Sequence, residues 1–249
     1  MPPEKTERLG FLNRALVQAA IVLGGAFLIS AIIFAYTFYA VRSLDDTLTA
    51  TGSAKQKVTA DSAKWTSSIS RSAFDGSIPA VYAQVERDTI AAKVYFKQAG
   101  IADDQIQVTP IFVNQEYSSN DGAQKRYSVM QSITVSSSDV QKVRGLAGGA
   151  GALIQKGVMF NPGMPEYYVS NLPSLRVSLL GEAVKDARAR ADELAKAGGV
   201  SVGKLKSSSS GVVQVLSPNS IEVSDYGSYD TQTIEKEVMV TVRATFSVR

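Results

Sequence analysis

Hydrophobic residues are concentrated in one uninterrupted stretch near the start of the chain, residues 15–41. The stretch has no charged residue, and its clearly polar side chains are Gln18, Ser30 and Thr37. About 20 apolar residues in a helix span the hydrocarbon core of a bilayer, so this stretch can cross a membrane with room to tilt. The pattern predicts a transmembrane anchor over residues 15–41, after a short segment 1–14 and before a domain over residues 46–249.

The basic residues that flank the stretch indicate its orientation. Three precede it and one follows it: Lys5, Arg8, Arg14 and Arg42. Because cytoplasmic flanks carry the excess of Lys and Arg, residues 1–14 are expected in the cytoplasm and residues 46–249 outside it. A cleaved signal peptide is the alternative. Its apolar core is ordinarily shorter, and Phe38 fits poorly three positions before a cleavage site, whereas Tyr36 and Tyr39 suit an interfacial aromatic belt.

Small residues recur along one side of the predicted anchor. They are Ala20, Gly24, Ala31 and Ala35, at helical spacing. A stripe of this kind lets two membrane helices approach closely, so these four residues are candidate contacts between copies of the chain. The alternative is that Ala and Gly are simply common in membrane helices.

After the anchor, alternating polar and apolar positions predict strands. Residues 46–58 and 63–72 show this alternation, and the break at residues 59–62 predicts that the two strands form a hairpin. Trp65, in the second strand, is expected in the core. Residues 105–136 are a second predicted hairpin, in which Pro110 marks a bend and residues 120–122, Asn-Asp-Gly, form the turn. Residues 238–248 alternate so regularly that they are expected inside a sheet.

Apolar residues at helical spacing predict two long helices. The first begins after Ser77, an N-cap, and ends at Gly100. The second covers residues 172–197 and ends at Gly198 and Gly199. Its predicted buried stripe consists of Leu175, Leu179, Ala183, Ala187, Leu194 and Ala195. Helices packed on antiparallel strands make the expected class α+β.

A glycine-rich segment follows the predicted N-cap at Asp139. Its glycines are Gly145, Gly148, Gly149 and Gly151. The segment lacks the Gly-Lys-Ser/Thr sequence of a phosphate-binding loop and holds no complete GxGxxG motif. It is either a broken helix or a site where glycine permits close approach of another backbone. The second alternative makes Gly145 and Gly149 candidate contacts between subunits.

The composition argues against an enzyme. The 249-residue chain has no His and no Cys, so it lacks the commonest general base, the commonest zinc ligands, thiol chemistry and disulfides. No metal or other cofactor is predicted. A net charge of +3 without a dense basic patch argues against nucleic-acid binding. Ser201 and Lys204 match the S-x-x-K pattern of Ser–Lys hydrolases, but they follow a helix instead of opening one. Asp103 and Asp104 are interpreted as solvated charges.

The longest polar loop, residues 217–233, carries Tyr226 and Tyr229 among Gly and Ser. Exposed Tyr in such a loop can form a recognition surface. An ordinary surface loop is the alternative.

Four segments together resemble the SIMPL-domain family of bacterial envelope proteins, whose relatives include a periplasmic immunogenic protein. They are residues 46–54 with 61–63, 100–107, 183–204 and 237–248, which are similar in order and spacing to the family's opening strand, Gly-Ile…Ile-Gln signature, Ala-rich helix with Gly-Lys exit, and closing strand. Ala60 stands where the family's pattern has Pro. No single motif is diagnostic.

The resemblance implies an α+β domain of antiparallel sheet packed against helices, an envelope location and assembly into ring- or channel-like homo-oligomers. It also implies a link to stress tolerance, and it assigns no catalytic residue. With the predicted anchor, the leading hypothesis is a non-enzymatic, single-pass protein of the inner (cytoplasmic) membrane, with its domain periplasmic or extracellular. A binding module for an envelope ligand or partner protein is the second hypothesis, and a Ser–Lys hydrolase is the third.

Overall fold

The structure is a computed structural model that describes residues 4–42, 46–117, 124–222 and 224–249. The turn predicted at residues 120–122 lies outside the described residues. The same holds for the side chains of Lys5, Arg8, Arg14 and Arg42, on which the predicted orientation depends.

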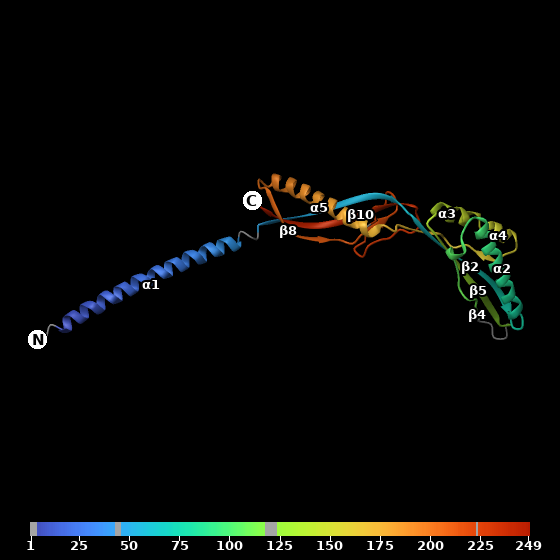
Figure 1. Cartoon of the computed structure of the whole chain (residues 1–249), viewed down its shortest axis with the longest axis horizontal. Coiled ribbons are helices and arrows are strands. Elements are labelled where there is room, and N and C mark those ends of the chain that lie inside the picture. The colour runs from blue at the N-terminus through green and yellow to red at the C-terminus, as the bar shows by residue number, and fades with distance from the viewer. Residues whose placement is uncertain (1–3, 43–45, 118–123, 223) are drawn as a thin grey trace. The chain divides into compact units, whose positions relative to one another are not determined.

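The N-terminal helix α1, Glu4–Arg42, contains the predicted anchor (Figure 1). Its apolar part, Leu16–Val41, has a mean hydropathy of 2.4, and none of its most apolar 18-residue window is buried. Among the described residues it is the one helix long and apolar enough to cross a membrane. The sequence prediction of one N-terminal apolar helix is therefore confirmed. A signal sequence near the N-terminus can also meet this criterion of length and hydropathy.

The chain divides into two compact units. The first comprises residues 1–52, 185–209 and 243–249, and the second comprises residues 53–184 and 210–242. The elements of a four-stranded sheet contribute residues to both units: β1 (Thr47–Thr59), β8 (Val202–Ser210), β9 (Gln214–Leu216) and β10 (Glu235–Val248), together with α5 (Leu172–Ala197). The strand order is β1-β10-β8, with β9 also paired to β10. As the alternation predicts, β10 lies inside the sheet.

In the first unit, alanines form the buried side of α5. Ala187, Ala191 and Ala195 are buried at intervals of four residues, and Phe246 of β10 is buried with them. The guanidinium of Arg188 lies 5.7 Å from the centre of the Phe246 ring. Leu194 was predicted in this stripe but is 56% exposed. Its prediction was wrong because each residue turns about 100° around the helix, so Leu194 falls beside the alanine row.

The second unit contains a six-stranded antiparallel sheet. Its strands are β2 (Ser62–Phe74), β3 (Ile106–Val108), β4 (Phe112–Glu116), β5 (Arg126–Ser137), β6 (Phe160–Asn161) and β7 (Glu166–Tyr168). The long central pair runs from Ala63 opposite Ser137 to Phe74 opposite Arg126. Both β3 and β4 pair with β5, on either side of Pro110, so the hairpin predicted over residues 105–136 is confirmed.

Three helices cover one face of this sheet (Figure 1). They are α2 (Ile78–Gln98), α3 (Val140–Gly149) and α4 (Gly151–Gln155). Trp65 lies at the centre of the core beneath them and is fully buried, as predicted. Its ring meets Phe96 and Phe160 edge to face, and its indole N–H donates to the carbonyl of Gly163 at 2.8 Å.

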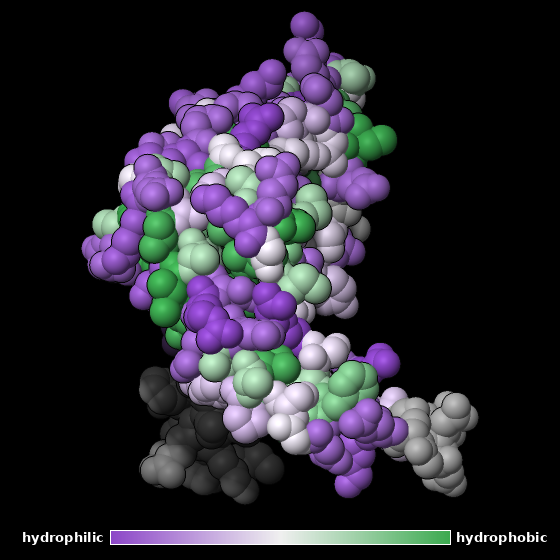
Figure 2. Space-filling view, turned by 90° about the vertical axis from the view of Figure 1, so that its right-hand side faces the viewer, coloured by the Kyte–Doolittle hydropathy of each residue, from purple (hydrophilic) through white to green (hydrophobic). Residues whose placement is uncertain are grey.

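The surface seen in Figure 2 is mostly hydrophilic, with its hydrophobic side chains in small groups.

The first two strands do not form the hairpin that the alternation predicted. β1 pairs with β10, whereas β2 pairs with β5. Between them, the N–H of Ala60 donates to the carbonyl of Ile234, and the N–H of Asp61 donates to the carbonyl of Tyr168. Alternation identifies a strand but not its partner. The prediction failed because the link bonds to two distant segments and does not close a turn.

The glycine-rich segment is helical with a break. α3 ends at Gly149, and α4 begins at Gly151. The carboxylate of Asp139 accepts from the N–H of Lys142 at 2.9 Å, so the predicted N-cap is confirmed. A β-carbon at position 149 would lie 2.8 Å from the hydroxyl oxygen of Tyr95, so α2 approaches this helix closely there.

We predict that Trp65→Ala lowers the free energy of unfolding by about 3–5 kcal/mol, because it empties the centre of the core. Trp65→Phe should have a smaller effect, about 1–2 kcal/mol, since it keeps an aromatic ring and loses the bond to Gly163. Urea unfolding of the full chain, followed by circular dichroism, measures both changes. Tyr117→Ala is the control, because Tyr117 is 97% exposed. A loss for Trp65→Ala no larger than for this control would contradict the prediction.

Candidate functional site

The loop of residues 217–233, between β9 and β10, folds back onto β9. The N–H of Val215 donates to the carbonyl of Ser228 at 2.7 Å, and the N–H of Asp230 donates to the carbonyl of Val215 at 2.8 Å. The second half of the loop is therefore held by main-chain bonds. These bonds fix the backbone at Ser228 and Asp230 to β9.

A fully buried lysine secures the end of this loop. The side chain of Lys236 is 0% exposed, and its ammonium group donates to the backbone carbonyl of Asp230 at 2.5 Å. The carboxylate of Asp230 lies 3.6 Å from the same nitrogen, and the ring of Tyr229 has its centre 5.9 Å away. The hydroxyl of Thr233 donates to the Asp230 carboxylate. These contacts satisfy a charge that burial alone would strongly disfavour.

The two charged groups of this cluster shift in directions that fit their surroundings. Burial lowers the pKa of Lys236, and the neighbouring Asp230 opposes that effect. Burial works against ionisation of Asp230 as well, but its hydrogen bonds from Thr233 and Gln232 and the charge of Lys236 prevail, so the pKa of Asp230 is lowered. Lys236 is enclosed and paired, and this arrangement stabilises the loop and does not present an amine to a ligand.

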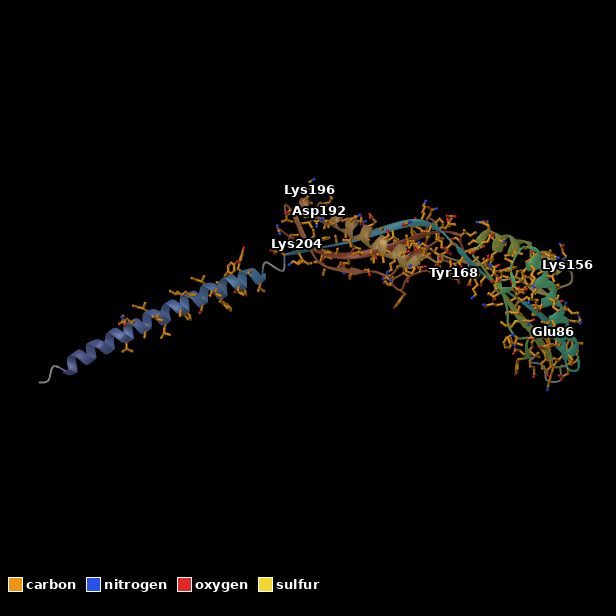
Figure 3. The ribbon with its side chains drawn as sticks, viewed as in Figure 1. Glu86, Lys156, Tyr168, Asp192, Lys196 and Lys204 are labelled. Carbon is orange, nitrogen blue, oxygen red and sulfur yellow. The ribbon has the colours of Figure 1, made fainter. Side chains whose placement is uncertain are left out.

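The two tyrosines predicted as a recognition surface have different surroundings. The hydroxyl of Tyr229 accepts from the N–H of Val169 at 2.9 Å, and its ring lies 5.8 Å from that of Tyr168, which is labelled in Figure 3. Tyr229 thus joins the loop to the segment after β7. Tyr226 is 97% exposed, and Ile221 in the same loop is 93% exposed. Tyr229 is still 39% exposed, so the exposed apolar side chains of this loop include Ile221, Tyr226 and Tyr229.

An open groove of about 510 Å³ lies between the start of α5 and the segment that joins β8 to β9. Its apolar lining comes from Leu172 and Pro173 on α5 and from Val212 and Val213 on the joining segment, with Arg176 as its charged residue. The neighbouring loop reaches this segment, since a β-carbon at Gly227 would lie 3.7 Å from Cβ of Val212. A volume of this size is typical of small-molecule sites.

The other candidate residues do not form a shared site. Ala20, Gly24, Ala31 and Ala35 are exposed along α1, and Gly24 has open space around it. Gly145 is exposed, whereas the close approach of Tyr95 explains Gly149 within one chain. The hydroxyl of Ser201 donates to the carbonyl of Arg249 at 3.3 Å, and Lys204 lies on the exposed β8 (Figure 3). Asp103 pairs with Lys97 at 2.5 Å on the surface.

Sequence reasoning missed both the buried lysine and the groove. The burial of Lys236 could have been predicted from the alternation of β10. Lys236 lies two residues before Val238 and four before Val240, so its side chain points to the same buried face. The groove could not be predicted, because its walls are about 40 residues apart in the chain. Within the described residues, no group of three or more acidic, His or Cys side chains could hold a metal ion. The groove thus places an apolar surface beside a cation, an arrangement that suits binding of a ligand.

A comparison with protein families identifies the domain that follows the apolar helix. The model described as SIMPL, a protein of unknown function (DUF541), matches residues 48–246. A comparison with curated proteins finds no match.

We predict that Asp230→Asn lowers the free energy of unfolding at pH 7 by about 1–2 kcal/mol, because it leaves Lys236 buried without its counter-ion. The pKa of Asp230 is lowered in the folded state, so its contribution is present above the usual aspartate pKa of about 3.9 and is lost as the pH falls through its folded value. The difference between the variant and the wild type should therefore shrink in strong acid. Denaturant titrations between pH 7 and pH 2 measure it.

Asp225→Asn is the matched control for this titration. Asp225 lies in the same loop and is exposed. It should change the free energy of unfolding little at any pH. Equal losses for the two variants, or a difference that does not depend on pH, would contradict the role given to Asp230.

Proposed function

The chain belongs to the SIMPL family, and from that premise we propose that it is a single-pass membrane protein whose extracytoplasmic domain forms a non-enzymatic homo-oligomeric assembly in the cell envelope. The SIMPL domain together with the N-terminal apolar helix suggests a membrane-anchored protein. We further propose that copies of the chain assemble, that the domain lies outside the cytoplasm, and that it catalyses no reaction.

The observation that carries the proposal is the exposure of α1. Its large apolar side chains between Leu16 and Val41 are 57–75% exposed. Burying one such side chain is worth about 1.5–3 kcal/mol, so leaving the whole helix in water is strongly unfavourable. A bilayer covers such a helix while its backbone groups stay bonded within it. We therefore propose that lipid, or lipid together with neighbouring copies of α1, covers the apolar side chains of this helix.

Two features support assembly through contacts between copies. The stripe of Ala20, Gly24, Ala31 and Ala35 leaves space for close helix packing in the bilayer. In the four-stranded sheet, β1 and β8 are the outer strands of the order β1-β10-β8. An outer strand presents unpaired backbone groups that can bond to another chain, and most residues of β8 are exposed.

The proposed orientation predicts opposite labelling of two introduced cysteines. Because the chain has no native Cys, Thr6→Cys and Tyr226→Cys each give a single thiol. A maleimide that cannot cross the cytoplasmic membrane should label Tyr226→Cys in intact cells and Thr6→Cys only after lysis. The reverse pattern would contradict the orientation. The intact mass of the purified protein tests cleavage independently, because a removed signal sequence would eliminate residues 15–41.

The proposed assembly predicts that Gly24→Leu reduces the mass of the particle formed by the full chain. A leucine in the small stripe would keep neighbouring helices apart. Mass photometry of the protein in nanodiscs or detergent measures the distribution of oligomers. Gly25→Leu is the matched control, since it makes the same change about 100° around the helix. Particles of unchanged mass for Gly24→Leu would mean that α1 only anchors the chain and does not hold copies together. A wild-type protein that stays monomeric at all concentrations would refute the assembly.

A binding module for an envelope ligand or partner is the second candidate. It is favoured by the groove beside Arg176 and by the exposed Tyr226 and Ile221 in the adjacent loop. Deleting the loop tip, residues 219–226, should then abolish capture of the partner and leave oligomerisation unchanged.

A further inference from the structure

We propose that the groove between α5 and the β8–β9 segment binds a single-chain amphiphile with a carboxylate head, whose charge pairs with Arg176. The inference rests on the binding-module alternative and is independent of assembly. Two properties of the groove lead to it: an apolar lining on both walls, and one cation without an anionic partner.

The first property is the composition of the walls. Leu172 and Pro173 form one wall and Val212 and Val213 the other. Val212 is 41% exposed, although a valine is more often buried. An apolar chain laid between these walls would remove their hydrocarbon surface from water, at about 25 cal/mol per Å². The volume of about 510 Å³ suits a small molecule.

The second property is the isolation of Arg176. Two other arginines of α5 have acidic partners one turn away: Arg190 lies 2.9 Å from Asp186, and Arg188 lies 3.8 Å from Asp192. In the part of the chain that the structure describes, Arg176 forms no ion pair. One turn away on either side it has Leu172 and Leu180. Its guanidinium is thus a free cation at the rim of an apolar groove.

The charge of the groove favours a carboxylate over other head groups. Among the residues that the structure describes, no acidic residue and no second basic residue lines it, and Ser210 adds one hydroxyl. A guanidinium matches a carboxylate with two parallel hydrogen bonds. A phosphate monoester head carries more charge than one arginine balances. A bilayer surface is flat and would not enter a groove, so a single free chain is the occupant that fits.

The test is binding of dodecanoate to the full chain in phosphatidylcholine nanodiscs, by equilibrium dialysis with empty nanodiscs as background. Nanodiscs avoid detergent, which would compete for an apolar groove. We expect saturable binding of one dodecanoate per chain, and much weaker binding of dodecanol and dodecyltrimethylammonium, which lack the negative charge. Arg176→Gln should weaken binding about tenfold or more, because a charge-assisted bond is lost. Arg176→Lys should retain part of the affinity.

Arg190→Gln is the matched control, an exposed arginine on the same helix outside the groove, and should bind like the wild type. Val212→Asp places a negative charge inside the groove and should abolish binding. Circular dichroism confirms that each variant is folded, and mass photometry of the same samples reports assembly separately.

Several results would overturn the inference. They are equal binding of dodecanol and dodecanoate, uptake no greater than by empty nanodiscs, wild-type affinity in folded Arg176→Gln, or binding of a peptide carboxyl terminus in place of dodecanoate. A loss of particle mass with unchanged dodecanoate binding would count against the assembly alone. The reverse result would count against the groove alone.

Discussion

The fold of the second unit depends on the hydrogen bonds around Asp61, where the chain passes from β1 to β2. Asp61 donates its N–H to Tyr168, and its carboxylate accepts from the N–H and hydroxyl of Ser170 at 2.8 and 2.6 Å. These bonds lower the pKa of Asp61. Tyr167 in turn donates to the carbonyl of Thr231 at 2.8 Å. These bonds hold three segments that are far apart in the chain at one place. On either side of Asp61, β1 and β2 pair in different sheets.

The groove and the loop both follow from this arrangement. The segment after β7, bonded to Asp61, leads directly into α5, so the position of its first turn is set by the same contacts. On the other side, Lys236 and Asp230 hold the end of the 217–233 loop, and Tyr229 bonds it to Val169. A buried charge pair adds little net stability, but it fixes one arrangement of the groups around it. Here the pair lies against Tyr229, whose hydroxyl bonds to Val169, whereas Tyr226 in the same loop is exposed.

The apolar helix imposes a separate constraint on function. Among the described residues of α1, the large apolar side chains between Leu16 and Val41 are 57–75% exposed, and lipid or other copies of the helix are the proposed cover for them. The SIMPL domain, in contrast, buries aromatic and aliphatic residues in cores of its own. The exposed apolar surface of the described residues is therefore concentrated in α1, and the proposed contacts between copies lie along α1 and the outer strands.

The sequence by itself determined the features that depend on neighbouring residues. An uninterrupted apolar stretch identified α1, and periodicity identified α5 and the strands of the β3–β5 hairpin, because each of these patterns is complete within a short segment of the chain. The caps at Asp139 and Gly199 were likewise local, and the family resemblance rested on short segments in order. Tertiary structure alone decided the rest. It separated β1 from β2, gave Gly149 a neighbour in Tyr95, and brought Val212 beside Arg176. Each of these depends on contacts between residues distant in the chain, and alternation or spacing carries no information about which distant partner a residue meets.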